Sequence, residues 1–188
     1  MKEVKILGLC GNARAGKDTF FNISKDLLYK RKVFTGRVAF ADELKKECDK
    51  FLIKNLSISA FTEDEKEKEL IRPFLVTYGT HLRRRLDENC WIKKAEPLVD
   101  LFMENQAIPV VTDVRFPNEA DWIHSLGGHV IHINRKGFGP ANKEEAENEP
   151  ILIDKSDEKV EWPTLGDPKT HKKEYINIIN KTIRSIFK

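Results

Sequence analysis

The sequence predicts an α/β protein with a parallel, doubly wound sheet of five strands and helices on both faces of that sheet. Short apolar runs of strand length alternate along the 188 residues with longer segments whose apolar residues recur at helical spacing. In addition, a glycine-rich loop at residues 11–16 separates the first apolar run from the first helical segment. Because ligands of such sheets bind outside the carboxyl ends of the strands, we expect the functional site at that edge.

The first part of the chain supplies two strands and three helices of this prediction. The strands are apolar runs with β-branched members, and the helices carry an apolar face. In chain order they are a strand at 4–10, a helix at 17–29, a strand at 33–41 and a helix at 42–52. Thr62 and Glu65 have the spacing of a capping box, so a third, long helix should begin there. Pro73 lies inside it and should kink or restart it.

The second part of the chain continues the alternation. It predicts a helix at 91–103, a strand at 108–112, a helix at 118–126, a strand at 129–134 and a short edge strand at 159–162. Gly127 and Gly128 end the helix that precedes them. Asp167 and Pro168 are a cap followed by proline at the first helical position, which predicts the start of a last helix.

Composition and charge exclude several classes of partner. The chain has 33 Lys and Arg against 30 Asp and Glu, so its net charge of +3 is a near cancellation. Without a basic stripe there is no general field for nucleic acid or for an anionic membrane, and we expect neither as a partner. Cys10, Cys48 and Cys90 have no metal-site or disulfide spacing, so we expect reduced, buried thiols. With no apolar segment of about 18 residues, we expect one domain in the cytoplasm.

The glycine-rich loop carries the strongest chemical signal, a G-x-x-x-x-G-K pattern. The residues concerned are Gly11, Asn12, Ala13, Arg14, Ala15, Gly16, Lys17, Asp18 and Thr19. Glycines let a backbone wrap a phosphate with its N–H groups pointing inward, a helix N-terminus adds positive potential, and the lysine reaches the β- and γ-phosphates. The place of the loop between a strand and a helix favours phosphate binding over the alternative, a structural turn.

Asp18 departs from the usual pattern, in which a serine or threonine ligates Mg²⁺. A carboxylate can hold Mg²⁺ directly or through water. It can equally balance the charge of the first helical turn. The sequence leaves both roles open, with Asp113 and Thr19 as other oxygen ligands.

Asp113, Arg115 and Glu119 form a second polar block, which begins where the third predicted strand ends. Arg115 can fork onto a phosphate, Asp113 can bind Mg²⁺ through water or orient a basic side chain, and Glu119 can accept hydrogen bonds from a base or sugar. The alternative is a surface pair of Arg115 and Glu119 with Asp113 as a helix cap. Because the glycine-rich loop must lie at the same edge of the sheet, we favour a second phosphate pocket.

These motifs resemble those of the phage-type deoxynucleoside monophosphate kinases. The matching segments are GKDT at 16–19, residues 39–45, the stretch 79–91 and VTDVRFPNE at 111–119. The resemblance runs from the N-terminus to about Arg135. Beyond it, residues 142–149 and Trp162-Pro163 depart from the family pattern.

The resemblance implies a P-loop NTPase-type three-layer α/β/α fold, with a helical acceptor-binding insert at about 42–106 and a short lid at about 135–150. It also implies ATP as the donor and Mg²⁺ as a cofactor. Catalytic roles are implied for Lys17, Arg135, Arg115 and Asp113. Acceptor contacts are implied for Ala41, Lys45, Arg72, Gly79, Thr80, Trp91, Asp113, Arg115 and Glu119. For Trp91, core packing is an equal alternative.

The expected reaction is transfer of the γ-phosphoryl group of ATP to a (deoxy)nucleoside 5′-monophosphate, which gives the diphosphate. No general base is needed, because a phosphate monoester has its second pKa near ~6 and is anionic at neutral pH. One alternative is a P-loop kinase of another small acceptor, such as dephospho-coenzyme A. Another is a non-kinase ATP-dependent switch or DNA-associated ATPase. The sequence also leaves open whether the protein is a homodimer.

Overall fold

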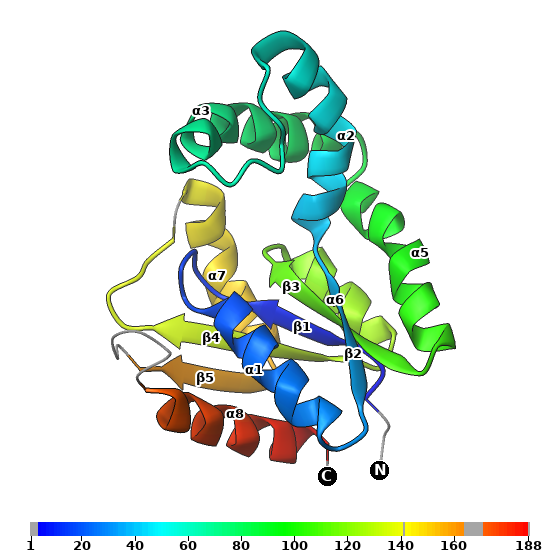
Figure 1. The fold of residues 1–188 in the computed structure, drawn as a ribbon, viewed down its shortest axis with the longest axis vertical. Coiled ribbons are helices and arrows are strands. Elements are labelled where there is room, and N and C mark those ends of the chain that lie inside the picture. Colours follow the sequence, from blue (N-terminus) through cyan, green and yellow to red (C-terminus); the bar gives the residue numbers. More distant parts are fainter. Residues whose placement is uncertain (1–3, 141, 164–170, 188) are drawn as a thin grey trace. The chain divides into compact units, whose positions relative to one another are not determined.

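The computed structural model describes residues 4–140, 142–163 and 171–187. The chain divides into two units, one of Met1–Val38 with Leu98–Lys188 and one of Ala39–Pro97. The first unit contains the sheet, and the second is built from helices (Figure 1).

Five parallel strands form the sheet of the first unit, in the order β2-β3-β1-β4-β5. They are β1 (Leu7–Cys10), β2 (Phe34–Val38), β3 (Ala107–Val114), β4 (His129–Arg135) and β5 (Glu158–Trp162). All four residues of the central strand β1 are buried, as expected for a strand that is covered on both faces. β5 lies at an edge of the sheet, as predicted.

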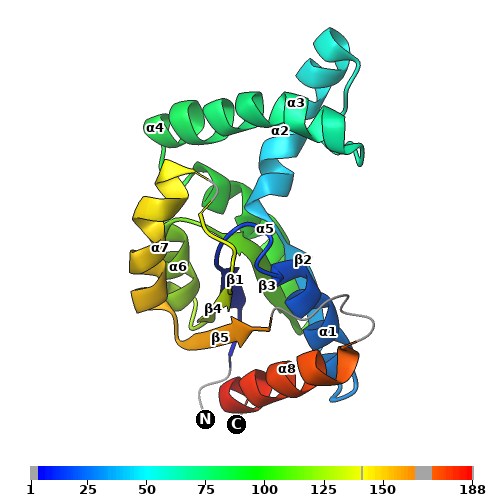
Figure 2. The ribbon, with the colours of Figure 1, turned by 90° about the vertical axis from the view of Figure 1, so that its left-hand side faces the viewer.

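Helices cover both faces of this sheet (Figure 2). α1 (Lys17–Tyr29) packs beside α8 (Lys172–Ile186) on one face, and α6 (Pro117–Ser125) packs beside α7 (Lys143–Lys155) on the other. The first pair covers a core whose large members are Phe20, Leu28, Tyr175 and Ile179. The predicted fold class, a three-layer α/β/α protein of the P-loop type with a five-stranded parallel sheet, is therefore confirmed.

α7 is a helix that the sequence pattern does not predict. Residues 143–149 are charge-dense and Pro150 lies inside the helix, and both features argue against a helix in the sequence. It forms because Asn142 caps it, accepting a hydrogen bond from the backbone N–H of Glu145 at 2.8 Å, and because Leu152 is buried. Asp167 and Pro168, the predicted start of the last helix, lie outside the described residues.

The second unit contains α2 (Phe40–Leu56), α3 (Glu65–Val76), a π-helical segment η1 (Thr77–Arg83), α4 (Arg84–Leu86) and the start of α5 (Cys90–Glu104). Cys48, Leu52, Ile58, Ala60 and Ile71 form its buried core. Cys10, Cys48 and Cys90 are free and buried, as predicted. Within the described ranges, none of the helices has the length and hydropathy needed to cross a membrane.

The predicted cap of α3 is wrong. Asp64, not Thr62, caps the helix: its side chain accepts hydrogen bonds from the backbone N–H groups of Lys66 and Glu67 at 2.9 and 3.0 Å. Pro73 does not restart the helix, because α3 continues through it to Val76. The hydrogen-bond pattern changes only at the following residue, where η1 begins.

Candidate functional site

The glycine-rich loop follows β1 and leads directly into α1. The backbone angle φ is 123° at Gly11 and 102° at Gly16, values that favour glycine. A Cβ atom at Gly11 would lie 2.1 Å from the carbonyl oxygen of Ile133, and one at Gly16 would lie 2.6 Å from Nε1 of Trp162. Both positions therefore require glycine. Since Gly16 at the N-cap has no side chain, the first N–H groups of α1 are available to an anion.

Lys17 is folded back over this loop. Its Nζ donates hydrogen bonds to the carbonyl oxygens of Gly11 at 2.7 Å and Asn12 at 2.9 Å. Burial lowers the pKa of Lys17, and the positive charge of Arg115 lowers it further, while Glu145 and Asp113 act in the opposite direction. The structure thus brings Lys17 within electrostatic range of Asp113 and Arg115, as the predicted pair of phosphate pockets requires.

The other loop residues differ in exposure. Ala15 is buried, whereas Arg14 is exposed and has a left-handed φ of 63°. Asp18 is exposed and Thr19 half-buried in the first turn of α1, and the charge of Asp18 acts on Lys17. Over the described part of the chain, no group of three or more His, Cys, Asp and Glu side chains is arranged to hold a metal ion.

The end of β3 lies beside the start of the glycine-rich loop, because β1 and β3 are neighbours and Cys10 pairs with Val114. Asp113 is half-buried and the Arg115 residue is exposed at this end. Both side chains therefore belong to the edge of the sheet that carries the loop, as we expected from the sequence.

Glu119 has a different place from the one expected. Its side chain is only 1% exposed, and Oε2 accepts hydrogen bonds from the backbone N–H groups of Arg115 at 2.7 Å and Phe116 at 3.0 Å. In this structure the carboxylate holds the turn from β3 into α6. The spacing of four residues predicts that Glu119 faces the same way as Arg115. It does not predict that the Glu119 carboxylate accepts hydrogen bonds from the backbone.

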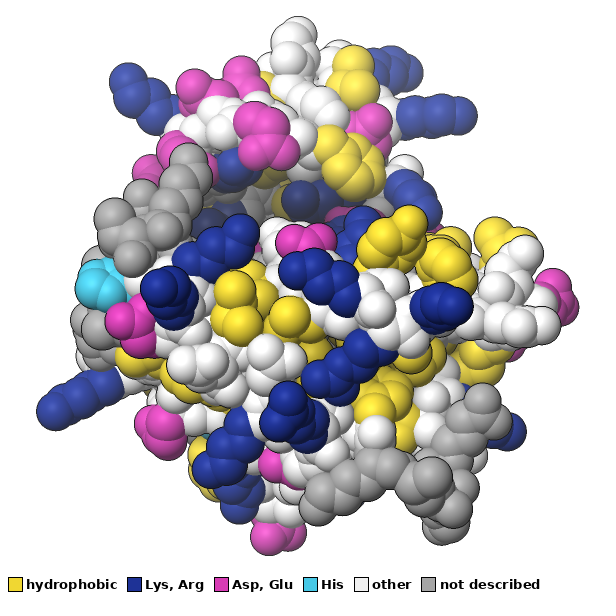
Figure 3. Space-filling view, turned by 60° about the horizontal axis from the view of Figure 1, so that its bottom comes forward, with side chains coloured by type: hydrophobic (Ala, Val, Ile, Leu, Met, Phe, Trp, Pro, Cys, Tyr) yellow, Lys and Arg dark blue, Asp and Glu magenta, His cyan; other side chains and the backbone are white. Residues whose placement is uncertain are grey.

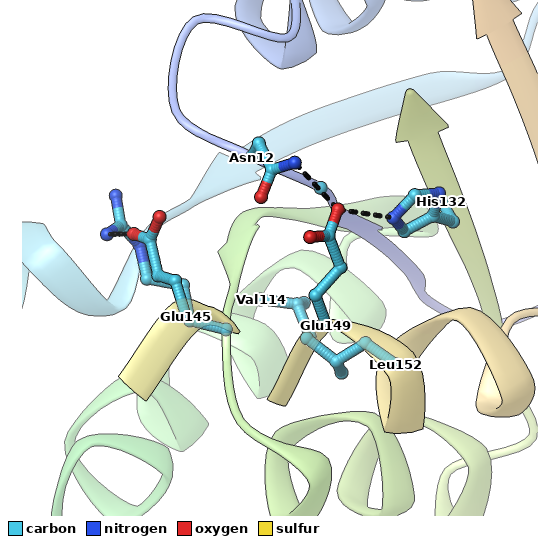
Figure 4. A pocket seen from close by; sticks show the side chains of 8 residues that line it. Asn12, Val114, His132, Glu145, Glu149 and Leu152 are labelled. Carbon is cyan, nitrogen blue, oxygen red and sulfur yellow. Dashed lines mark hydrogen bonds and ion pairs between the residues drawn. The ribbon is translucent and has the colours of Figure 1, made fainter. Parts of the chain in front are cut away.

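A pocket lies between the loop, the end of β3 and α7 (Figure 4). Its lining residues are Gly11, Asn12, Val114, Arg115, His132, Glu145, Glu149 and Leu152. Arg115 forms a close ion pair with Glu145 through Nη1 and Oε1. Asn12 donates from Nδ2 to Oε1 of Glu149 at 2.6 Å, so α7 contacts both the glycine-rich loop and the segment after β3.

His132, Glu145 and Glu149 are site residues that the sequence reasoning does not find. His132 is 4% exposed, burial lowers its pKa, and its Nε2 lies 3.8 Å from Oε1 of Glu149. The signal that could have found the two glutamates is the spacing of Asn142 and Glu145, which is that of a helix cap followed by an acidic third residue. A helix starting there places Glu145 and Glu149 on one face.

Arg135, the predicted lid arginine, is the last residue of β4. It is half-buried, and its guanidinium lies 4.7 Å from the centre of the Phe138 ring. Phe138 is thus held to the end of β4 by a cation–π contact.

The remaining predicted acceptor residues belong to the second unit. They are Ala41, Lys45, Arg72, Gly79, Thr80 and Trp91. Arg72 is exposed, and Nζ of Lys45 lies 5.5 Å from the centre of the Phe61 ring. Gly79 and Thr80 fall in η1, and π-helical turns of this kind are frequent at functional sites.

Trp91 is buried within the second unit. It is 3% exposed, and its indole N–H donates to the carbonyl oxygen of Gly79 at 3.2 Å. The guanidinium of Arg83 lies 5.8 Å from the Trp91 ring. Of the two alternatives for Trp91, these contacts favour core packing over an open wall for a base.

The sequence matches the family described as deoxynucleotide monophosphate kinase over residues 22–158. The chain belongs to the deoxynucleotide monophosphate kinase family. A protein of Acanthamoeba polyphaga mimivirus named "Putative deoxynucleotide monophosphate kinase" is 34% identical over 151 residues, covering 71% of this chain and 75% of the viral protein. These findings confirm the resemblance that the sequence motifs indicate.

A viral protein and a solved structure extend the comparison. "Uncharacterized protein ORF77" of Ictalurid herpesvirus 1 is 39% identical over 70 residues, which are 37% of this chain and 30% of that protein. The crystal structure of TT1252 from Thermus thermophilus has a TM-score of 0.52 and 14% identity, covering 100% of both chains. At this identity the structural likeness concerns the fold alone.

Proposed function

We propose that this member of the family transfers the γ-phosphoryl group of ATP to a deoxynucleoside 5′-monophosphate. The products are ADP and the deoxynucleoside diphosphate. One observation supports the proposal: Lys17, at the end of the glycine-rich loop after β1, and Arg115, just after the neighbouring strand β3, lie at the same edge of the sheet and within electrostatic range of each other. Such a site can hold two phosphate groups next to each other. A transfer of this kind is catalysed mainly by positioning and charge neutralisation.

The roles follow from the contacts. Lys17 would leave the carbonyl oxygens of Gly11 and Asn12 to contact the β- and γ-phosphates of ATP. Arg115 would bind the acceptor phosphate with its planar fork, and Arg135 would stabilise the transferred group. Glu119 would hold the backbone of Arg115 in place.

The glycine-rich loop fits a triphosphate, because the positive φ angles of Gly11 and Gly16 let its backbone turn tightly and no side chain caps the N-terminus of α1. Mg²⁺ would neutralise charge on the β- and γ-phosphates, with Asp18, Thr19 or Asp113 as oxygen ligands beside phosphate and water. In the second unit, the acceptor contacts of Lys45, Arg72 and the η1 residues Gly79 and Thr80 belong to this proposal on the strength of the family motifs.

A panel of acceptors tests the proposal. The protein is mixed with ATP and Mg²⁺ and with each of the ribo- and deoxynucleoside monophosphates or dephospho-coenzyme A, and diphosphate and ADP formation are measured. We expect stoichiometric nucleoside diphosphate and ADP with at least one deoxynucleotide. ADP that forms at the same rate with and without every acceptor would instead indicate an ATPase, and product with dephospho-coenzyme A alone would indicate another small-acceptor kinase.

A further inference from the structure

α7 presents two carboxylates, one helical turn apart, to the two segments that bind phosphate (Figure 4). Glu145 forms the ion pair with Arg115 at the end of β3. Glu149 accepts the hydrogen bond of 2.6 Å from Asn12 in the glycine-rich loop. A single helix outside the known motifs therefore contacts both the expected donor side and the expected acceptor side.

Both carboxylates are held in place. The side chains of Glu145 and Glu149 are 12% and 22% exposed, and the cap at Asn142 fixes the first turn of α7 at the backbone of Glu145. Buried Leu152 anchors the same helix. An ordered carboxylate of this kind can fix the direction of its partner side chain.

The partners keep phosphate-binding groups that α7 does not use. A guanidinium has five N–H donors in a planar fork, and Glu145 contacts Nη1 of Arg115 while the arginine side chain remains 47% exposed. Asn12 contacts Glu149 through its side chain, whereas a glycine-rich loop binds phosphate through backbone N–H groups. The two glutamates can therefore stay bound while phosphates enter.

We propose that α7 is a positioning element, in which Glu145 orients Arg115 for the acceptor phosphate and Glu149, through Asn12, fixes the glycine-rich loop for ATP. This proposal rests on the proposed function. An opposite role can be stated from the same contacts: the carboxylates would occupy the places of phosphates and would have to leave when substrates bind. Under the positioning role, removing a carboxylate weakens binding of the substrate; under the opposite role, removing it tightens binding.

The experiment separates the two substrates. Glu145→Gln and Glu149→Gln keep the size of the side chain and remove its charge. Glu147→Gln is the matched control, because Glu147 lies on the same helix, is 64% exposed and pairs only at 3.7 Å with Lys143 in the described structure. For each variant, kcat and KM are measured for ATP and for the monophosphate. The equilibrium Kd of each ligand is measured without the other, and a melting curve reports folding.

We expect Glu145→Gln to raise KM and Kd of the monophosphate by about 10-fold, as for the loss of one charge-assisted contact, and to leave those of ATP within about twofold. Glu149→Gln should raise KM and Kd of ATP and leave those of the monophosphate within about twofold. Glu147→Gln should change the constants of neither substrate. A loss of folding alone would not produce a split by substrate. If either glutamine variant melts early, Glu145→Asp and Glu149→Asp, which keep the charge but shorten its reach, must show the same split.

Three results would overturn the positioning role. Tighter binding of the monophosphate by Glu145→Gln would show that the carboxylate competes with phosphate. Equal changes for both substrates would show a general structural role, and no change would show that the contacts are idle. If the wild type binds both ligands but transfers no phosphoryl group, the proposed function fails while the Kd values still decide the role of α7. If it binds neither ligand, both proposals fail.

Discussion

Lys17 shows at the scale of one residue how the site satisfies its charges. Its ammonium donates to two carbonyl oxygens of its own loop, and burial lowers its pKa. When a phosphate enters the loop, the Lys17 ammonium can exchange these neutral carbonyl oxygens for anionic phosphate oxygens. Hydrogen bonds to an anion are stronger, so this exchange is favourable. The place of Lys17 follows from the sequence motif, but its loop contacts do not, because they depend on the left-handed turn at Gly16.

Lys17→Ala should lower kcat by roughly 10²–10³, the loss typical of one preorganised electrostatic contact in the transition state. Lys25→Ala is the matched control, since Lys25 is exposed on the same helix. The measurement is steady-state kinetics with saturating ATP and monophosphate, together with a melting curve. A well-folded Lys17→Ala protein with activity within a few-fold of wild type would remove the glycine-rich loop from the catalytic site.

Arg115→Lys and Arg115→Ala should both weaken use of the monophosphate by about 1.5–3 kcal/mol in kcat/KM, because lysine cannot replace a planar fork. The Kd of ATP without acceptor should change little. Arg184→Lys, on the exposed side of α8, serves as the control. Loss of ATP affinity in the Arg115 variants would place the arginine on the donor side.

At the scale of the element, α1 and α7 differ in how far the sequence determines them. The predicted bounds of α1 agree with the structure at both ends, because glycine precedes it and its apolar residues recur regularly. α7 is short of apolar residues and contains Pro150, so it is held by the polar contacts of Glu145 and Glu149 and by buried Leu152. The spacing of apolar residues predicts a helix that buries an apolar face, but it does not predict a helix that is held mainly by polar contacts.

The cap of α3 gives an element-scale prediction. Asp64→Ala should lower the free energy of unfolding by about 1 kcal/mol, because two backbone N–H groups lose their acceptor. Glu63→Ala is the control, since the Glu63 side chain is 95% exposed and lies just before the cap. Urea unfolding monitored by helical circular dichroism measures both. Equal effects of the two substitutions would mean that the Asp64 cap contributes nothing specific.

At the scale of the whole molecule, the alternation of strands and helices predicts a parallel sheet but not the order of its strands. That order decides the site, because it places β3 beside β1. The sequence also does not mark the limits of the second unit, Ala39 and Pro97, since the second falls inside α5. Whether the insert and the lid act as parts of one kinase domain stays a prediction.

Surface charge is likewise arranged in a way that composition does not show. The near cancellation of charge describes the chain as a whole, but on the face seen in Figure 3 several Lys and Arg side chains gather near one another. The absence of a nucleic-acid partner therefore stays a prediction, one that net charge alone does not support. Binding measured against a labelled single-stranded oligonucleotide in low salt addresses it.

A partly buried contact between a carboxylate and a phenol in the second unit links the stability of that unit to pH. Tyr78 donates from its hydroxyl to Oε1 of Glu47 at 2.5 Å, and Arg83 and Lys94 also contact this carboxylate. The hydrogen bond to Glu47, together with burial, raises the pKa of Tyr78 to about 12 from its ordinary value of 10.0. The folded protein thus keeps the phenol proton at a pH where the unfolded chain has lost it.

The contribution of Tyr78 to the free energy of unfolding should therefore be complete below pH 10 and should be lost as the pH rises towards 12. Tyr78→Phe removes the titrating group, so the stability difference between wild type and variant should shrink between pH 8 and about 11. Tyr29→Phe is the control, because Tyr29 is 66% exposed. Urea unfolding curves of the three proteins at both pH values provide the measurement. If the difference in free energy of unfolding between wild type and Tyr78→Phe is the same at both pH values, Glu47 does not hold the phenol in its protonated form. The stability of the second unit then does not depend on that proton.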